Sequence, residues 1–410
     1  MHVVYIHQYF TTPEMAGGTR SFEMARRLVA AGHRVSMVTS CRDSDGGKDW
    51  YTTSEAGIDV HWLPVPYSNK MSYPQRIRAF VRFAVASATK AASLRGDVVF
   101  ATSTPLTVAI PGIYSSWRCR VPMVFEVRDM WPAVPIAIGA IRNPIVIAGA
   151  RWLERLAYRH AARIVALAPG MRDDIVASGI PATKVTVIPN GSDLDIFGQA
   201  DSRVADPRTE VSWLGDRKLI VFTGTLGKVN GVDYMAEVAA RVRAIDPDIR
   251  FVVIGGGAEE PFIRDTARRL GVLDSTFFML PSQKKHEVAA WVRTSDMVMC
   301  LFTGPRVIWK DAVQNKFFDA LAAGKPTASN FEGFQSIVAV EHDVGLILSP
   351  NDYQSAANAL VAALNDQAWI KAVPARAKRL AEGEFSRDSL AKQLTDVLVG
   401  AVAGRPTVNE

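Results

Sequence analysis

Four polar residues in the last third of the chain have the types and spacing to bind a phosphorylated sugar: Asp311, Asn315, Lys316 and Asp319. If they lie on one helix, Asp311, Asn315 and Asp319 are four residues apart and share a face. Carboxylates accept hydrogen bonds from ribose hydroxyls, while a lysine and the free N–H groups at a helix start bind phosphate. The pattern predicts a site for a ribose diol and an anionic phosphate. The alternative is a solvated, charged helix edge.

Two glycine-containing turns are expected to approach an anion as well. The turn AGGTR (16–20) has Gly17 and Gly18 before a helix and Arg20 in its first turn. The turn TGTLGKVNG (223–231) lies between a strand and a helix and carries Lys228. Glycines let backbone N–H groups come close to an anion, and the basic side chains add charge. Neither turn fits a dinucleotide or P-loop pattern, so the alternative is an ordinary strand-to-helix turn.

A third group of charges, within FEVRDMWP (125–132), is expected at the end of a strand. The two-residue period of a strand puts Glu126 and Arg128 on one face, and Asp129 follows them. Half-buried charges at the carboxyl end of a central strand are costly without a partner, which favours a functional role. The alternative is an internal Glu126–Arg128 ion pair that only fixes the loop.

Other chemistries have no matching pattern. The seven histidines form no HExxH or similar pair, so we expect no catalytic metal. Three widely spaced cysteines give neither a disulfide framework nor a zinc spacing, and no GxSxG element is present. We expect His7, at the end of the first strand, to be a hydrogen-bonded structural residue.

The elements that must position these residues read as two successive α/β halves, each with a parallel sheet. We expect an N-terminal domain over 1–194, a linker over 195–216, a second domain over 217–384 and a C-terminal helical segment over 385–410. After an initial apolar run at 2–10, strands are expected at 34–40, 58–65, 97–102, 121–127, 163–167, 184–189, 219–224, 250–257, 277–280, 297–302, 327–330 and 345–349. Helices are expected at 19–31, 232–244, 261–270, 284–293, 311–322, 353–364 and 387–402.

Length and composition agree with this organisation. A chain of 410 residues, 48% hydrophobic and 21% charged, is expected to form two or three globular domains. No signal peptide is recognisable, and the most apolar window, 133–150, is interrupted by Pro135, Arg142 and Pro144. We therefore expect a cytoplasmic protein. Its net charge of +6 is compatible with a phosphorylated substrate or an anionic membrane surface, and is weak support for nucleic acid.

One segment, 69–95, combines basic residues with aromatic and aliphatic ones. Lys70, Arg78 and Arg82 alternate there with Ile77 and Phe80. Such a helix can lie on anionic lipid, which would make the protein peripheral on the inner face of the cell membrane. The alternative is an ordinary surface helix with one core face.

The motifs GGTR, EVRDMWP, VIPNG, TGTLGKVNG and NKFFDALAAGKP occur in an order that resembles GT-B glycosyltransferases of family 4. The resemblance covers nearly the whole chain and is strongest to the bacterial surface-polysaccharide branch that includes fucosamine-transferase-like enzymes. It implies two Rossmann-like, doubly wound domains facing across a cleft. It also implies retaining transfer of a sugar from a nucleotide sugar to an acceptor, with no metal or other cofactor.

The resemblance assigns donor-binding roles to residues of both halves. Gly17, Gly18 and Arg20 would meet the donor diphosphate from the first domain, and Lys228 and Lys316 would neutralise it from the second. In the second domain, the ribose hydroxyls would bind at the carboxylate of Asp319, which stands where the family has the second Glu of a Glu-x7-Glu pair.

Three departures from the family pattern matter. The usual Arg and Lys of the turn that begins at Gly224 are Thr225 and Asn230 here. The first Glu of the pair corresponds to the shorter Asp311. The His of a mid-chain His-Asp pair facing the donor sugar and acceptor is replaced by Arg128, followed by Asp129.

The implied reaction joins a sugar, from a donor for which the resemblance favours a UDP link, to a polyprenyl-diphosphate-linked or saccharide acceptor. Glu126 or Asp129 would accept the acceptor proton or position sugar hydroxyls. Two alternatives stay open: a nucleotide-sugar epimerase on the same fold, and a non-catalytic protein that binds sugar nucleotides.

Overall fold

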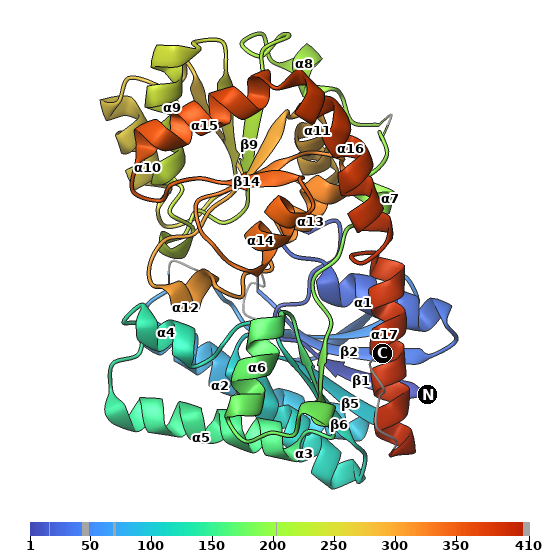
Figure 1. The fold of residues 1–410 in the computed structure, drawn as a ribbon. Helices are drawn as coiled ribbons and strands as arrows, with labels where there is room; N and C mark the ends of the chain where they lie inside the picture. The colour runs from blue at the N-terminus through green and yellow to red at the C-terminus, as the bar shows by residue number, and fades with distance from the viewer. Residues whose placement is uncertain (16, 43–48, 69–70, 202, 405–410) are drawn as a thin grey trace. The chain divides into compact units, whose positions relative to one another are not determined.

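The computed structural model describes residues 1–15, 17–42, 49–68, 71–201 and 203–404. The backbone forms two compact units (Figure 1). Unit 1 contains Met1–Thr12, Thr19–Pro189 and the chain from Asp388 onward; unit 2 contains Pro13–Gly18 and Asn190–Arg387. Each unit has its own sheet and its own apolar core. The expected class, two doubly wound α/β units, is confirmed.

Unit 1 is built on an eight-stranded sheet with the order β3-β4-β2-β1-β5-β6-β7-β8. All neighbouring strands are parallel except β3 and β4, which form an antiparallel hairpin. The central strands are buried along almost their whole length, as expected of a parallel sheet covered on both faces. The strands are β1 (His2–Ile6), β2 (Arg34–Cys41), β3 (Tyr51–Glu55), β4 (Ile58–Pro64), β5 (Val98–Thr102), β6 (Met123–Val127), β7 (Arg163–Ala166) and β8 (Val185–Val187).

Helices cover both faces of this sheet (Figure 1). On one face, α1 (Arg20–Ala30) and the C-terminal α17 (Arg387–Ala403) share one core with the strands, in which Leu390, Leu394 and Leu398 are buried. On the other face α2 (Tyr73–Ser93) packs on α3 (Ala109–Cys119), which in turn packs on α5 (Pro144–His160). The helices α4 (Ala133–Ala137) and α6 (Pro169–Ala177) complete the described helices of unit 1, beside two single 3-10 turns.

Unit 2 is built on a six-stranded, fully parallel sheet with the order β11-β10-β9-β12-β13-β14. Its strands are β9 (Leu219–Thr223), β10 (Arg250–Ile254), β11 (Phe277–Leu280), β12 (Met297–Cys300), β13 (Thr327–Ser329) and β14 (Gly345–Ile347). Its helices are α7 (Leu194–Phe197), α8 (Pro207–Glu210), α9 (Asp233–Ile245), α10 (Glu260–Arg269), α11 (Lys285–Thr294), α12 (Arg306–Trp309), α13 (Asn315–Ala322), α14 (Phe334–Glu341), α15 (Tyr353–Asn365) and α16 (Gln367–Glu382).

The strand and helix order agrees with the sequence-based expectation, with several additions. The hairpin strand β3 was not expected because its residues are polar and half-exposed. The helix α16 has Pro374 in its interior, a residue that ordinarily signals a helix boundary. The stretch 195–216, expected to be a linker, belongs to unit 2 and contains α8 and most of α7.

Both sheets reverse their strand order at one point, and this locates the candidate sites. In unit 1 the reversal lies between β1 and β5, and in unit 2 it lies between β9 and β12. Ligands of open α/β sheets bind outside the carboxyl ends of the strands at such a reversal. The residues singled out above lie at the end of β6 or follow β1, β6, β9 and β12, so the topology brings them to these edges.

No helix within the described ranges has the length and hydrophobicity needed to cross a membrane.

Candidate active site

In unit 2 the turn after β9 is shaped by glycine. Gly224 has φ +135°, and its N–H donates to the carbonyl of Ile254 at 3.0 Å. The neighbouring turn after β10 contains Gly255, where a Cβ would lie 1.9 Å from the Gly224 carbonyl oxygen. Only glycine fits at such a close backbone approach. The two turns therefore form one tight layer at the edge of the sheet.

Lys316 lies against this turn. Its ammonium is 3.6 Å from the centre of the Phe222 ring, and a Cβ built on Gly224 would be 3.5 Å from its Nζ. Burial lowers the pKa of Lys316 to about 8. Within the described part of the chain Lys316 forms no ion pair, so a desolvated cation faces the glycine turn with only an aromatic ring as partner.

Lys316 is positioned by α13, which begins at Asn315, four residues later than expected. The N–H of Gln314 donates to Gln335 Oε1 at 2.7 Å, and Gln314 Nε2 donates to the Leu301 carbonyl at 3.0 Å. The apolar side of the helix is buried, including Phe317. Beyond the helix, Gly324 adopts φ +69°, the left-handed conformation that ends a helix.

Asp319 lies one turn after Asn315 on α13. Burial raises the pKa of Asp319 to about 7, against the opposing influence of Lys285, Arg387 and Lys316. Among the described residues, Oδ1 of Asp319 and Oδ1 of Asn315 are both buried without a hydrogen-bond partner. Buried oxygens without partners are rare in proteins, and sugar hydroxyls would satisfy them.

Asp311 does not share the helix face with these residues, which corrects the expectation. It lies in the turn before α13, because the helix begins only at Asn315. Its carboxylate is buried, with Oδ2 3.6 Å from the ammonium of Lys310.

The rest of the turn after β9 is accessible. Thr225 and Lys228 are exposed, and Lys228 begins the single 3-10 turn Lys228–Asn230. The amide of Asn230 donates to the Thr225 carbonyl at 2.7 Å. Lys228 is thus free to turn toward an anion, whereas Asn230 holds the loop.

The first glycine turn also belongs to unit 2 by its contacts. Gly17 has φ +138°, and a Cβ on Gly18 would lie 2.8 Å from Nδ2 of Asn315. The backbone of Gly18 therefore approaches the start of α13 closely. Ala16 lies outside the described residues.

Arg20 departs from its expected role. Its guanidinium is fully buried and donates to Glu126 and to the carbonyl oxygens of Ile188 and Pro189. The prediction that it pairs with a ligand phosphate is therefore wrong for this structure. Arg20 instead connects the start of α1 to β6 and to the two residues that directly follow β8, Ile188 and Pro189.

The expected role of Glu126 is also corrected, because this side chain too is buried and bound within unit 1. Its side chain is fully buried, with Oε1 2.8 Å from Arg20 Nη2 and Oε2 accepting from Thr102 Oγ1 at 2.5 Å. Burial alone would raise the pKa of Glu126, but Arg20 and Arg128 outweigh it and hold the pKa below its usual value. Glu126 is therefore ionised and enclosed, and the expected alternative, a pair with Arg128, is replaced by the pair with Arg20.

Arg128 and Asp129 remain at the accessible edge of the unit 1 sheet. The Arg128 N–H donates to Ser103 Oγ at 3.0 Å, and Asp129 Oδ2 accepts from Thr104 Oγ1 at 2.7 Å. Arg128 Nη1 lies 3.4 Å from His7 Nε2. The structure thus gathers residues that follow β1, β5 and β6 at the strand-order reversal.

His7 has a larger place in this group than the sequence suggested. Burial, with the nearby charges of Arg128 and Arg42, lowers the pKa of His7 well below its usual value, so the imidazole is neutral. Its Nδ1 is buried without a hydrogen-bond partner in the described ranges. The family's histidine is missing beside Asp129, and a neutral imidazole reaches the same edge from β1. The only sequence feature that could have indicated a place for His7 in this group is its position at the end of the first strand.

In the described ranges, no three His, Cys, Asp or Glu side chains cluster in a way that could hold a metal ion.

Comparison with known proteins assigns a class to this fold. Residues 16–191 match the family model described as glycosyl transferase 4-like domain, and residues 217–366 match the model described as glycosyl transferases group 1. The D-inositol 3-phosphate glycosyltransferase of Streptosporangium roseum is 24% identical over 95% of this chain and 89% of its own length. The putative colanic acid biosynthesis glycosyl transferase WcaI of Escherichia coli is 23% identical over 66% of this chain and 70% of its own.

Solved structures show the same fold. Anabaena HepE in complex with UDP aligns with a TM-score of 0.70 at 17% identity, covering 98% of this chain and 100% of that one. Sucrose-phosphate synthase from Thermosynechococcus elongatus aligns with a TM-score of 0.76 at 15% identity, covering 98% and 99%. The fold is GT-B. With both family models matched, the chain is a GT-B glycosyltransferase of the family 4 type.

Proposed function

We propose that this protein transfers a sugar from a UDP-linked donor to a polyprenyl-diphosphate-linked or saccharide acceptor in bacterial surface polysaccharide synthesis, with retention of anomeric configuration. In this proposal unit 2 binds the donor nucleotide, and the polar residues at the edge of the unit 1 sheet serve the acceptor. The reaction uses no metal ion. A fucosamine-transferase-like specificity is the branch that the sequence motifs favour.

The observation that carries the proposal is the environment of Lys316. A half-buried ammonium with a lowered pKa faces a glycine turn at the strand-order reversal of unit 2. A desolvated cation without an ion pair is costly, and a bound diphosphate would offset that cost. The buried free oxygens of Asn315 and Asp319 on the same helix suit the hydroxyl groups of a ribose.

The chemistry of leaving-group departure explains why such a cation would matter. When the bond between the anomeric carbon and the donor phosphate breaks, negative charge develops on the phosphate oxygen. Lys316 and Lys228, with the N–H groups at the start of α13, would stabilise that charge without reorganisation. The acceptor hydroxyl would attack from the face that the leaving group vacates, and the electron pair of the broken bond would stay on the diphosphate.

On the acceptor side, Asp129 is the remaining carboxylate that could receive the hydroxyl proton. It is exposed and ordered by Thr104, whereas Glu126 is enclosed by Arg20. Arg128 beside the neutral His7 would bind sugar hydroxyls or the acceptor phosphate.

The names of relatives support the donor and the pathway. HepE has been solved with UDP and with UDP-glucose. WaaG, described as a glycosyltransferase involved in lipopolysaccharide biosynthesis, aligns with a TM-score of 0.68, and WcaI is named for colanic acid biosynthesis.

The test is a donor screen followed by a transfer assay. UDP and GDP sugars are screened by thermal shift, and the stabilising donors are incubated with polyprenyl-diphosphate-linked saccharides with and without EDTA. The proposal expects a glycosylated lipid that keeps the donor's anomeric configuration and forms equally well in EDTA. An epimerised donor in the absence of acceptor, or binding with no transfer, would instead support one of the two alternative functions.

A further inference from the structure

The outer helices of unit 1 expose large apolar side chains in matching stripes. On α2, Ile77 and Val81 are exposed one turn apart. On α3 Trp117 is 69% exposed, and on α5 Ile145 and Trp152 are 80% and 64% exposed. A single exposed apolar residue is ordinary, but such residues on three neighbouring helices form an unusual surface.

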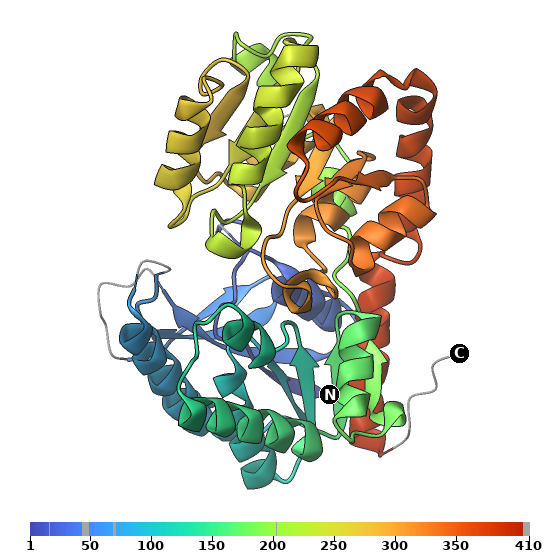
Figure 2. The same ribbon diagram turned by 60° about the vertical axis from the view of Figure 1, so that its left-hand side comes forward.

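These helices form one layer. α2 packs on α3, and α3 packs on α5, on the face of the sheet opposite α1 and α17 (Figures 1 and 2). Each helix turns its buried side to the sheet, so its exposed stripe points away from it. We call this outer surface of α2, α3 and α5 the apolar face.

The N-terminal half of α5 is the most unusual part of the apolar face. Between Pro144 and Leu156 none of the residues is buried, and burial begins only at Ala157. The helix nevertheless has a firm start, because Asn143 Oδ1 accepts from the N–H groups of Ile145 and Val146. Helices in globular proteins are stabilised mainly by packing of an apolar side, and in this half that side, with Ile147, Ala150 and Leu153, is only partly covered within unit 1.

The charge around the apolar face has one sign. The helices α2, α3, α4 and α5 carry eight Lys or Arg residues and a single acidic residue, Glu154. Glu154 is half-buried, accepts a hydrogen bond from Tyr158, and has its pKa raised by burial. The whole chain has a net charge of +6, so these helices hold its entire positive excess.

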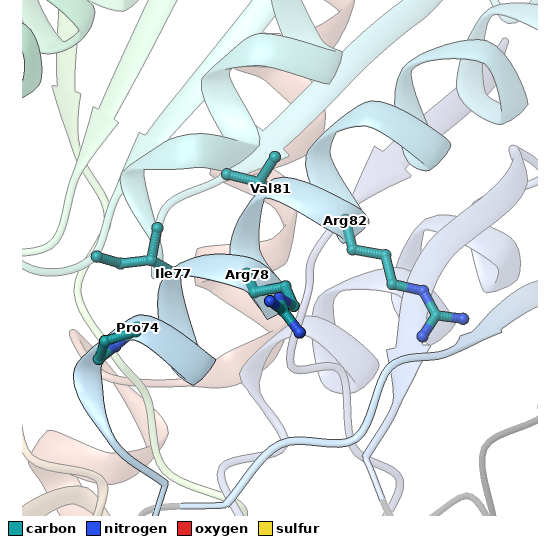
Figure 3. A pocket seen from close by; sticks show the side chains of 5 residues that line it. All are labelled: Pro74, Ile77, Arg78, Val81 and Arg82. Atoms are coloured by element: carbon teal, nitrogen blue, oxygen red, sulfur yellow. The ribbon is translucent and has the colours of Figure 1, made fainter.

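Apolar and basic groups alternate at short range on α2. Pro74, Ile77 and Val81 line a shallow hollow of about 540 Å³ together with Arg78 and Arg82 (Figure 3). The lining of this hollow is nearly all apolar, because it is formed by the three apolar side chains and by the methylene stems of the two arginines. Asn69 and Lys70, which begin the basic segment in the sequence, lie outside the described residues.

We propose that the apolar face is a membrane-docking surface that inserts the α5 start and the α2 stripe into the headgroup region of an anionic bilayer. Aliphatic and tryptophan side chains enter the interface, while flanking arginines pair with lipid phosphates. Anionic lipid is the occupant that fits, because the face combines exposed apolar groups with positive charge and almost no carboxylates. This inference rests on the proposed function, since a polyprenyl-linked acceptor resides in a membrane. The lipid contact expected from the sequence involved only the segment 69–95, whereas the apolar face extends over three helices.

The test is flotation of the full-length protein with phosphatidylcholine vesicles, with and without phosphatidylglycerol, in the absence of donor and acceptor. The expected result is binding to the anionic vesicles that weakens with salt. Ile145→Ser/Trp152→Ser removes two large apolar side chains. Because withdrawing even one of them from the interface should cost about tenfold, the partition coefficient should fall by at least tenfold. Arg78→Ser/Arg82→Ser should reduce it about fivefold per arginine at low salt.

The matched control is Phe262→Ser, which removes an exposed aromatic from α10 in unit 2 and should bind like the parent protein. Absence of vesicle binding would overturn the proposal, as would equal binding by all variants. A dimer of the parent protein without lipid, lost in Ile145→Ser/Trp152→Ser, would also overturn the proposal, because the apolar face would then bind a second copy of the chain. UDP binding is measured on the same samples, because UDP binding without vesicle binding rejects only the docking surface. Vesicle binding without UDP binding or transfer rejects only the proposed function.

Discussion

Nη2 of Arg20 lies 2.8 Å from Oε1 of Glu126, and both side chains are fully buried in unit 1. This pair connects the first residue of α1 with the second-last residue of β6, just before Arg128 and Asp129. Thr102 and two backbone carbonyls complete its hydrogen bonds. Its position indicates that it supports the edge of the sheet on which the acceptor-side residues stand, without touching a ligand.

Removing one partner of this pair should be strongly destabilising. Arg20→Met leaves the Glu126 carboxylate buried and unpaired, which costs about 3–5 kcal/mol in the free energy of unfolding. Urea unfolding followed by circular dichroism measures this. Arg20→Met/Glu126→Leu should recover part of the loss, since no charge is then left buried. The exposed pair Arg34–Asp59 gives the control, because Arg34→Met should change stability by less than about 1 kcal/mol. An equally small effect for Arg20→Met would contradict the structural role.

Lys316 should matter for turnover far more than for folding. Lys316→Ala is expected to lower kcat/KM by about 10²–10³-fold, or about 3–4 kcal/mol, as for the loss of one donor to a developing oxyanion. Initial rates of transfer from the preferred donor measure this. Lys378→Ala, at an exposed lysine on α16, should leave the rate unchanged. A Lys316→Ala enzyme that works at the parent rate would remove this residue from the site.

Nucleotide binding should weaken as the pH rises through the pKa of Lys316. Burial lowers that pKa to about 8, so the ammonium is charged below this pH and neutral above it. The terminal phosphate of UDP is already ionised above about pH 6, so its charge is constant in this range. Calorimetry should give an affinity about tenfold lower at pH 9 than at pH 7. The Lys316→Met protein should bind weakly at both pH values. A steep pH dependence that persists in this variant would assign the effect to another group.

Asp319 should make stability fall as the pH rises from about 4 to about 7. In the unfolded chain this carboxyl ionises near pH 4, whereas in the folded protein burial raises its pKa to about 7. The folded state therefore holds a proton that the unfolded state has lost, and the native state is penalised increasingly across this window. Asp319→Asn should be more stable than the parent by on the order of 2 kcal/mol at pH 8, and by much less at pH 4.

Thermal unfolding across pH tests this, with Asp173→Asn as the control at an exposed aspartate. The groups that act on Asp319 are Lys285, Asp193, Arg387 and Lys316. A stability difference between parent and Asp319→Asn that is constant from pH 4 to pH 8 would show that its pKa is not raised.

Much of the fold follows from the sequence because apolar strands and amphipathic helices alternate regularly. The end of α13 near Gly324 was predictable from the glycine, whereas the periodicity placed its start at Asp311, four residues before the observed start at Asn315. The pairing of Arg20 with Glu126 was not, since the two residues are 106 positions apart and the contact depends on how β1, β6 and β8 are ordered. The contact between His7 and Arg128 could not be predicted for the same reason, since these residues are 121 positions apart in the sequence.

Asp129 is the acceptor-side residue that should separate chemistry from donor binding. Asp129→Asn keeps a hydrogen-bond acceptor for Thr104 but cannot take up a proton, so transfer should fall by about 10²–10⁴-fold. UDP affinity, measured in parallel, should stay at the parent value. Full transfer by Asp129→Asn would show that this carboxylate does not act as the base.

The most direct measurement is a crystal structure of the protein with UDP. The predicted result places the diphosphate within hydrogen-bond distance of Lys316 Nζ and of the backbone between Gly224 and Lys228, with the ribose hydroxyls on Asp319. A UDP molecule bound elsewhere, with the Lys316 ammonium still facing only the Phe222 ring, would contradict the donor site and the function inferred from it.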